Sequence, residues 1–114
     1  MYFLISSTYK LFKFLIMKVT HIKGKFSVMT PNGESELLYI NKDNAYIRIY
    51  RTFTPERDAE NGVAERLTIA AFSFARKNRL KVRPDCPFII TFLEKNKRFK
   101  KQLTKDNSFR GSSL

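Results

Sequence analysis

The sequence is poor in several residue types, and each scarcity limits the class of protein it can encode. Its 114 residues include one cysteine, one histidine and no tryptophan. A single cysteine excludes an internal disulfide framework and fits a reducing cytoplasm. No Cys/His cluster has metal-ligand spacing, so we expect no zinc or other metal site. A chain of this length is expected to form one domain with a modest core.

Acidic residues are also scarce, and the resulting charge is concentrated in one segment. The chain has 10 Asp and Glu against 22 Lys and Arg, a formal net charge of +12. Residues 76–105 contain eleven basic and two acidic residues and so carry +9 of that charge. Such a field attracts nucleic acid, acidic membranes or phosphorylated cofactors. A solvated basic face on an ordinary protein has the same composition, so charge alone leaves the function open.

The chain lacks an uninterrupted hydrophobic run long enough to span a membrane. Residues 1–16, "MYFLISSTYKLFKFLI", are apolar and aromatic but are interrupted by Lys10 and Lys13. No basic region precedes this run and no small-residue cleavage site follows it, which argues against a signal peptide. An interfacial anchor is one alternative. We favour an N-terminal extension before a natural start at Met17, then a domain over 17–103 and a flexible tail over 104–114.

Hydrophobic residues are plentiful, at 43% of the chain with eleven Phe, which predicts a globular fold. Apolar and polar residues alternate in residues 20–30, which predicts a strand. Residues 35–41 are a second predicted strand, and residues 45–54, rich in aromatic and β-branched side chains, are a third. In the first strand Ile22, Phe26 and Val28 are expected to point inward. Short turns at 31–34 and 42–44 would join the strands into an antiparallel meander.

The pattern changes after residue 54, where a polar loop leads into a helical segment. Apolar residues in 62–78 are spaced as one face of a helix. A short strand over 80–84 and a second helix over 87–96 follow. A strand, a helix and a strand in that order imply a crossover and a parallel strand pair. The predicted class is therefore α+β, an antiparallel meander followed by a helix-strand-helix crossover.

The single cysteine lies in "RPDCPF", residues 83–88, between two prolines. Proline is favoured at the first position of a helix, where its missing N–H would be unpaired anyway. If Pro87 occupies that position, Cys86 is the N-cap and its sulfur lies at the positive end of the helix dipole. Such a location raises the reactivity of a thiol. The alternative is that Cys86 is a small buried hydrophobe, as most free cysteines are.

Two blocks of sequence, "TFTPERDAENGVAERL" and "LKVRPDCPF", carry a resemblance to a known family. Together with the meander they resemble the small YjdJ-type members of the GNAT acetyltransferase superfamily over roughly residues 34–103. The second block is matched nearly throughout and is the more specific. The resemblance implies a small GNAT-like fold, acetyl-CoA as cosubstrate, and transfer of an acetyl group to an amine that the sequence does not identify.

The resemblance also implies where the cosubstrate would bind. The loop before the first long helix holds the pyrophosphate through backbone N–H groups in this family, as helix N-termini do generally. The matching positions here are Asn61, Gly62, Val63 and Ala64. Gly62 removes a Cβ where the backbone must approach the ligand.

Further positions match by the same resemblance. Thr52, Phe53 and Thr54 correspond to the strand edge that pairs with the pantetheine arm, where a backbone N–H would polarise the thioester carbonyl. Asn96 falls where relatives carry His or Asn. Cys86 falls on the family's cysteine, near the expected thioester, where it would act beside the leaving thiolate or carry the acetyl group transiently.

Several residues depart from the family pattern, and two other functions stay open. Ala59 and Glu60 replace a basic residue and a glycine, Arg51 replaces a histidine, and residues 55–65 carry a net charge of −3. An acidic loop is a poor host for a pyrophosphate. The first alternative is therefore a catalytically degenerate domain that binds CoA or a protein partner.

The second alternative is a small basic protein that binds nucleic acid through residues 95–105, with Phe99 stacking on a base. A solvated C-terminal helix would explain that segment equally. We assign no catalytic base from the sequence. We expect His21 to be a surface strand residue, far from the other candidates in sequence.

Overall fold

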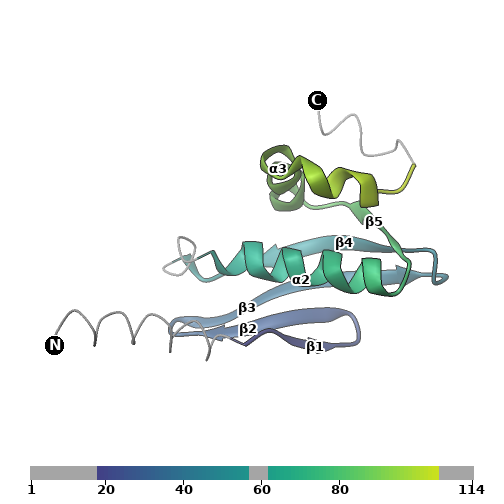
Figure 1. The fold of residues 1–114 in the computed structure, drawn as a ribbon. Helices are drawn as coiled ribbons and strands as arrows, with labels where there is room; N and C mark the ends of the chain where they lie inside the picture. Colours follow the sequence, from purple (N-terminus) through teal and green to yellow (C-terminus); the bar gives the residue numbers. More distant parts are fainter. Residues whose placement is uncertain (1–17, 57–61, 106–114) are drawn as a thin grey trace, which may run out of the picture.

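A five-stranded sheet organises the chain, in a computed structural model that describes residues 18–56 and 62–105 (Figure 1). Its strands are β1 (Thr20–Ile22), β2 (Lys25–Thr30), β3 (Gly33–Lys42), β4 (Tyr46–Phe53) and β5 (Lys81–Pro84). They lie in the order β1-β2-β3-β4-β5. The first four are antiparallel neighbours, and β5 runs parallel to β4. The predicted meander, the parallel pair and the α+β class are confirmed.

The predicted strand 20–30 is wrong in one respect, because a turn at residues 23–24 divides it into β1 and β2. Gly24 has a φ of 86°, a left-handed conformation that lets the chain reverse there. In the resulting hairpin Ile22 pairs with Lys25, whereas Phe26 is one residue further on and faces the core. Ile22 is therefore 57% exposed and not inward, while Phe26 and Val28 are buried as predicted.

Helix α2 (Val63–Lys77) covers one face of the sheet (Figure 1). Its side chains Val63, Leu67, Ala71, Phe72 and Ala75 are almost fully buried against the strands. This spacing is the apolar face that the sequence predicts. Within the described ranges, no helix is long and apolar enough to cross a membrane.

A second helical layer follows β5, made of α3 (Pro87–Lys95) and a 3₁₀ helix, η2 (Lys97–Gln102). The Phe99 ring lies 5.3 Å from that of Phe72 and 5.5 Å from that of Phe92, so it ties η2 to both α2 and α3. Phe99 is thus engaged by the core, and the prediction that it stacks on a nucleic-acid base is not supported. After η2, Leu103 bridges to Val82 and brings the chain back beside β5. The N-terminal extension and residues 106–114 of the predicted tail lie outside the described residues.

Candidate functional site

The two parallel strands separate at the carboxyl end of β5. Pairing between β4 and β5 ends at Ile49 and Pro84, followed by one further bond from the Asp85 N–H to the Ile49 carbonyl, 2.9 Å long. Strand β4 continues to Phe53, while the segment after β5 turns away into α3. Among the described residues, nothing pairs with the β5 side of β4 beyond Ile49. An unpaired strand edge of this kind accepts an extended ligand with amide groups.

A bulge in β4 begins at the same place. Leu38 of β3 pairs with Arg51 and the next residue, Tyr39, pairs with Ile49, so Tyr50 is an extra residue in β4. A bulge bends a strand and re-aims the side chains that follow it. As a result Thr52, which pairs with the fully buried Leu37, is turned toward the region where β4 and β5 separate beyond Ile49 and Pro84, which we call the opening.

Cys86 lies at the inner end of this opening. It is the N-cap of α3, with Pro87 in the first turn, as the sequence predicts. Its backbone is extended, as N-caps require, and its carbonyl accepts bonds from the Ile89 and Ile90 N–H groups at 3.0 and 3.2 Å. The side chain is only 6% exposed, and its sulfur lies 3.4 Å from the hydroxyl oxygen of Thr52. The residue thus has the buried environment of a core cysteine and one polar neighbour on β4.

The end of β4 is anchored on its other side. The Ser35 hydroxyl donates to the Phe53 carbonyl at 2.9 Å and lies 2.7 Å from the Thr54 hydroxyl. Because Ser35 is fully buried, this polar contact fixes the backbone of Phe53 and Thr54. The Phe53 side chain is 46% exposed on the sheet face away from α2. Phe53 therefore contributes its backbone N–H and C=O groups to this edge, and not its ring.

The N-terminus of α2 supplies backbone donors at the same end of the molecule. Gly62 is its N-cap, with a left-handed φ of 70°, and no side chain caps the helix. The first intrahelical bond runs from the Arg66 N–H to the Gly62 carbonyl, so the N–H groups of Val63 and Ala64 precede the helical ladder. These donors and the positive dipole end favour an anion. Asn61 lies outside the described residues.

An ion pair that was not predicted from the sequence links the two sides of the opening. The Arg48 Nε donates to an Asp85 carboxylate oxygen at 2.6 Å and so ties the middle of β4 to the residue before Cys86. The Arg48 guanidinium also lies 5.7 Å from the centre of the Tyr50 ring. Arg48 and Asp85 are 37 residues apart, so no local sequence pattern predicts that they pair. Only the position of Asp85 next to Cys86 could have drawn attention to it.

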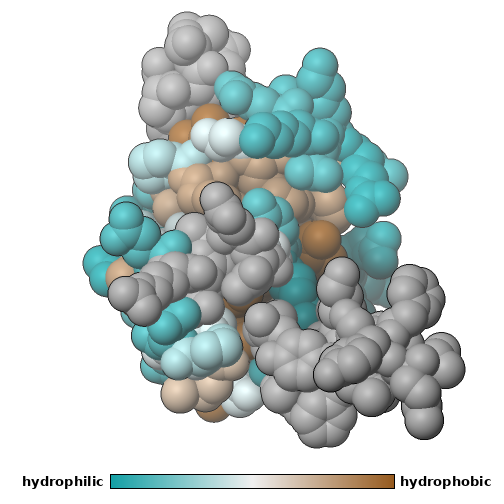
Figure 2. All heavy atoms as spheres, turned by 90° about the vertical axis from the view of Figure 1, so that its left-hand side faces the viewer, coloured by the Kyte–Doolittle hydropathy of each residue, from teal (hydrophilic) through white to brown (hydrophobic). Residues whose placement is uncertain are grey.

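Figure 2 shows this end of the molecule, which is the left-hand side of Figure 1. Hydrophobic residues form a band across the upper part of this view, with hydrophilic residues above it to the right. Among the described residues, the arrangement combines a strand edge without a partner, a helix N-terminus whose first N–H groups precede the helical ladder, and a buried thiol. These are the parts needed to bind a ligand that is anionic at one end and amide-bearing along its length.

Comparison with known proteins agrees with this geometry. Residues 25–103 match the model of the family described as GCN5-related N-acetyl-transferase, which is more than half of the 114 residues. The chain belongs to the GCN5-related N-acetyltransferase family. Members of this family use acetyl-CoA as cosubstrate. No curated protein matches the chain.

A solved structure shares the fold of this GCN5-related chain. It is a solution NMR structure of a Staphylococcus aureus protein proposed to be a GCN5-like N-acetyltransferase. The two chains are 25% identical and superpose with a TM-score of 0.64. The similarity covers 78% of this chain and 89% of the other. The GNAT-like fold predicted from the sequence is thereby confirmed.

Two residues considered from the sequence lie away from the opening in this GCN5-related domain. Asn96 is the C-cap of α3, at the opposite end of that helix from Cys86, and its amide donates to the Phe92 carbonyl at 2.9 Å. Its predicted contact with the cosubstrate stays a prediction. His21 is exposed on β1, at the sheet edge opposite β5, and its ring stacks on Phe26.

Proposed function

We propose that this chain is an acetyl-CoA-dependent N-acetyltransferase of the minimal, YjdJ-like type, acting in the cytoplasm. The observation that carries the proposal is the opening between β4 and β5, with the unpaired β4 edge on one side, the α2 N-terminus at its mouth and Cys86 at its inner end. Membership of the GCN5-related N-acetyltransferase family also supports an acetyl-CoA-dependent transferase. The acceptor is an amine of unknown identity.

The described residues fit acetyl-CoA at both of its polar regions. The N–H groups of Val63 and Ala64, with the positive end of the α2 dipole, would hold the pyrophosphate. The main chain of Thr52 to Thr54 would pair with the amides of the pantetheine arm, because this edge has no other described partner. Acetyl-CoA supplies an acetyl group activated as a thioester.

The residues of the chain then have three tasks in the transfer. A backbone N–H near Thr52–Thr54 would stabilise negative charge on the carbonyl oxygen as the amine attacks. The held geometry would align amine and carbonyl, which removes much of the entropic barrier. The thiol of Cys86 and the hydroxyl of Thr52, 3.4 Å apart, would deliver a proton to the departing sulfur. As the C–N bond forms and the C–S bond breaks, the amine releases one proton to solvent water and the CoA sulfur gains one, and solvent returns a proton to the Cys86–Thr52 pair.

The decisive experiment is calorimetric titration of the protein with acetyl-CoA and with CoA. We expect micromolar binding that is abolished in Gly62→Glu, because a carboxylate at the α2 N-terminus repels the phosphates. Met29→Glu is the matched control, since it adds the same charge at a residue that is 69% exposed on β2. Loss of binding in both variants, or no binding to millimolar concentration, would refute the cosubstrate site.

A second measurement separates an enzyme from a degenerate binding domain. Release of free CoA from acetyl-CoA is followed with a panel of small amines and amine-bearing peptides, at concentrations where binding is saturated. Turnover that depends on the added amine supports the transferase. Tight binding without acceptor-dependent turnover would instead establish the degenerate CoA-binding protein that the acidic 55–65 loop suggests.

A further inference from the structure

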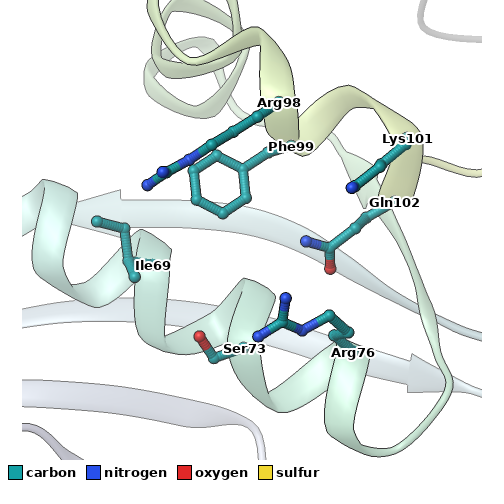
Figure 3. Close-up of a pocket in the computed structure, with 7 residues that line it drawn as sticks. All are labelled: Ile69, Ser73, Arg76, Arg98, Phe99, Lys101 and Gln102. Atoms are coloured by element: carbon teal, nitrogen blue, oxygen red, sulfur yellow. The ribbon is translucent and has the colours of Figure 1, made fainter.

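A basic cleft lies between α2 and η2, apart from the residues assigned to acetyl transfer. It has a volume of about 290 Å³ (Figure 3). Arg76 extends into it from α2, and Arg98 and Lys101 extend from η2. None of the residues predicted to bind acetyl-CoA or to act in the transfer lines it, whereas Phe99 and three other residues of the basic segment 95–105 do. The volume is at the low end of the range for small-molecule sites, roughly 300–1,000 Å³.

The positive charge of this cleft is uncompensated within the described part of the chain. An adjoining cavity of about 270 Å³ shares Arg76 and Lys101 and adds Arg79 and Lys81 to its lining. Within the described ranges 18–56 and 62–105, no acidic residue lines either cavity. Among residues 18–56 and 62–105, none of these cations forms an ion pair. Their mutual repulsion in the free protein favours a bound anion.

One of the cations is held in place by an aromatic ring. The Arg98 guanidinium carbon lies 4.8 Å from the centre of the Phe99 ring, a cation–π contact. The Phe99 ring is itself fixed against Phe72 and Phe92. Arg98 therefore lies along a rigid apolar wall (Figure 3). Arginine in a fixed orientation suits bidentate contact with a phosphate group.

The cleft also offers groups that a bare inorganic anion would not use. The Oε1 atom of Gln102 is buried and has no hydrogen-bond partner among the described residues, and its side-chain amide points into the cleft (Figure 3). A buried acceptor without a partner is costly, so a rotation of the Gln102 amide that brings Oε1 to a ligand N–H or O–H donor would be favoured. Ile69, 40% exposed, adds apolar surface at the wall. The lining residues therefore favour a ligand that combines a phosphate group, a hydrogen-bond donor and an apolar ring.

We propose that the α2–η2 cleft binds a nucleoside phosphate, with Arg76, Arg98 and Lys101 on the phosphate and Gln102 on the nucleoside. Two sources present this chemistry: a free nucleotide, or the 3′-phosphoadenosine end of CoA. Only the second source rests on the proposed transferase function. The free nucleotide would make this a second site of the protein.

The test uses adenosine 3′,5′-bisphosphate in calorimetric titrations at low salt. Arg76→Gln/Lys101→Gln should weaken binding at least about tenfold, because each lost charge-assisted bond contributes on the order of a factor of ten. Lys18→Gln/Lys23→Gln is the charge-matched control on the far edge of the sheet and should bind as the unaltered protein does. Equal affinity of the unaltered protein and the cleft variant would overturn the proposal.

Two further probes examine the nucleoside part of the ligand. Gln102→Met keeps the side-chain volume and should weaken adenosine bisphosphate while leaving inorganic phosphate unchanged. Inorganic phosphate that binds as tightly as the nucleotide would refute nucleoside recognition. Binding of single-stranded oligonucleotides alone, with a steep loss in salt and no affinity for the mononucleotide, would show a polyanion surface instead and also overturn it.

Titrations with CoA and with dephospho-CoA, which lacks the 3′-phosphate, distinguish the two sources of the ligand. If the cleft variant weakens CoA but not dephospho-CoA, the cleft holds the end of the cosubstrate. If neither changes while adenosine bisphosphate is weakened, the cleft holds a separate nucleotide. Binding of adenosine bisphosphate that survives Gly62→Glu but fails in the cleft variant supports the cleft even where the transferase proposal fails.

Discussion

The sulfur of Cys86 lies 3.4 Å from the hydroxyl oxygen of Thr52, although 34 residues separate them in the sequence. The contact joins the two blocks that carry the family resemblance, one on β4 and one at the start of α3. It exists because the β4–β5 pairing ends at Pro84 and the bulge at Tyr50 turns Thr52 inward. The inner end of the opening is therefore built from both blocks at once.

Thr52→Val should lower kcat with little change in stability. Valine keeps the shape of threonine but removes the hydroxyl beside the Cys86 sulfur, so we expect a loss of about tenfold, the order of one hydrogen bond. Steady-state acetylation and urea unfolding measure the two effects. Thr54→Val is the comparison, because its hydroxyl contacts buried Ser35; it should lower the free energy of unfolding by about 1 kcal/mol. Full kcat in Thr52→Val would remove that hydroxyl from the mechanism.

Much of the fold was predictable because its signals are local. The turn at 42–44 and the aromatic and β-branched residues of 45–54 indicate β3 and β4, and the spacing of apolar residues specifies α2. Pro87 marks the first turn of α3 because proline fits there without losing a bond. By contrast, continuous alternation through residues 20–30 hid the short turn at Gly24.

The rest depends on contacts between distant residues, which no local pattern encodes. The Arg48–Asp85 pair requires β4 and β5 to be parallel neighbours in one register. The basic cleft requires η2 to fold back so that Phe99 reaches Phe72. Composition indicated the positive charge of residues 76–105 but not that three of its members surround one cavity.

The thiol of Cys86 should react slowly in the folded protein. It is 6% exposed at the inner end of the opening, so a bulky thiol reagent has much less access to the sulfur than in the unfolded chain. We expect labelling by a disulfide reagent at least about a hundredfold slower than in urea, which corresponds to roughly 2.7 kcal/mol. Labelling is followed by absorbance, with Cys86→Ala as the blank. A native rate close to that in urea would show an accessible, reactive thiol.

Arg79→Gly should stabilise the protein. Arg79 follows the end of α2 with a left-handed φ of 58°, and the Leu80 N–H bonds back to the Ala75 carbonyl at 2.7 Å. This C-terminal motif normally carries glycine, since other residues pay a steric penalty there. The expected gain is about 1 kcal/mol in the free energy of unfolding.

The control for Arg79→Gly lies two residues earlier, within α2. Lys77→Gly removes the same sign of charge from a helical position and should lower the free energy of unfolding by about 1 kcal/mol. Urea titrations of both variants give opposite shifts of the midpoint if the backbone conformation of Arg79 is the cause. Shifts in the same direction would attribute the effect to charge.

Acid should destabilise the protein in part through His21. Burial lowers the pKa of this imidazole from 6.5 in the folded state, where the ring stacks on Phe26 and its Nε2 lies 2.6 Å from the Tyr39 hydroxyl. The unfolded chain then binds the proton more readily, so stability falls as the pH drops below 6.5 and levels off once the pH is below the folded-state pKa. Because the side chain is largely exposed, the effect should be small.

The measurement for His21 is the difference in Tm between the protein and His21→Gln from pH 7.5 to pH 5. Carboxylates titrate in both proteins, so the difference isolates the imidazole. The advantage of the unaltered protein should shrink as the pH falls, because desolvation of the partly buried ring disfavours the charged imidazole. A difference that grows toward pH 5 would mean that the folded state prefers the charged ring and would contradict the burial argument.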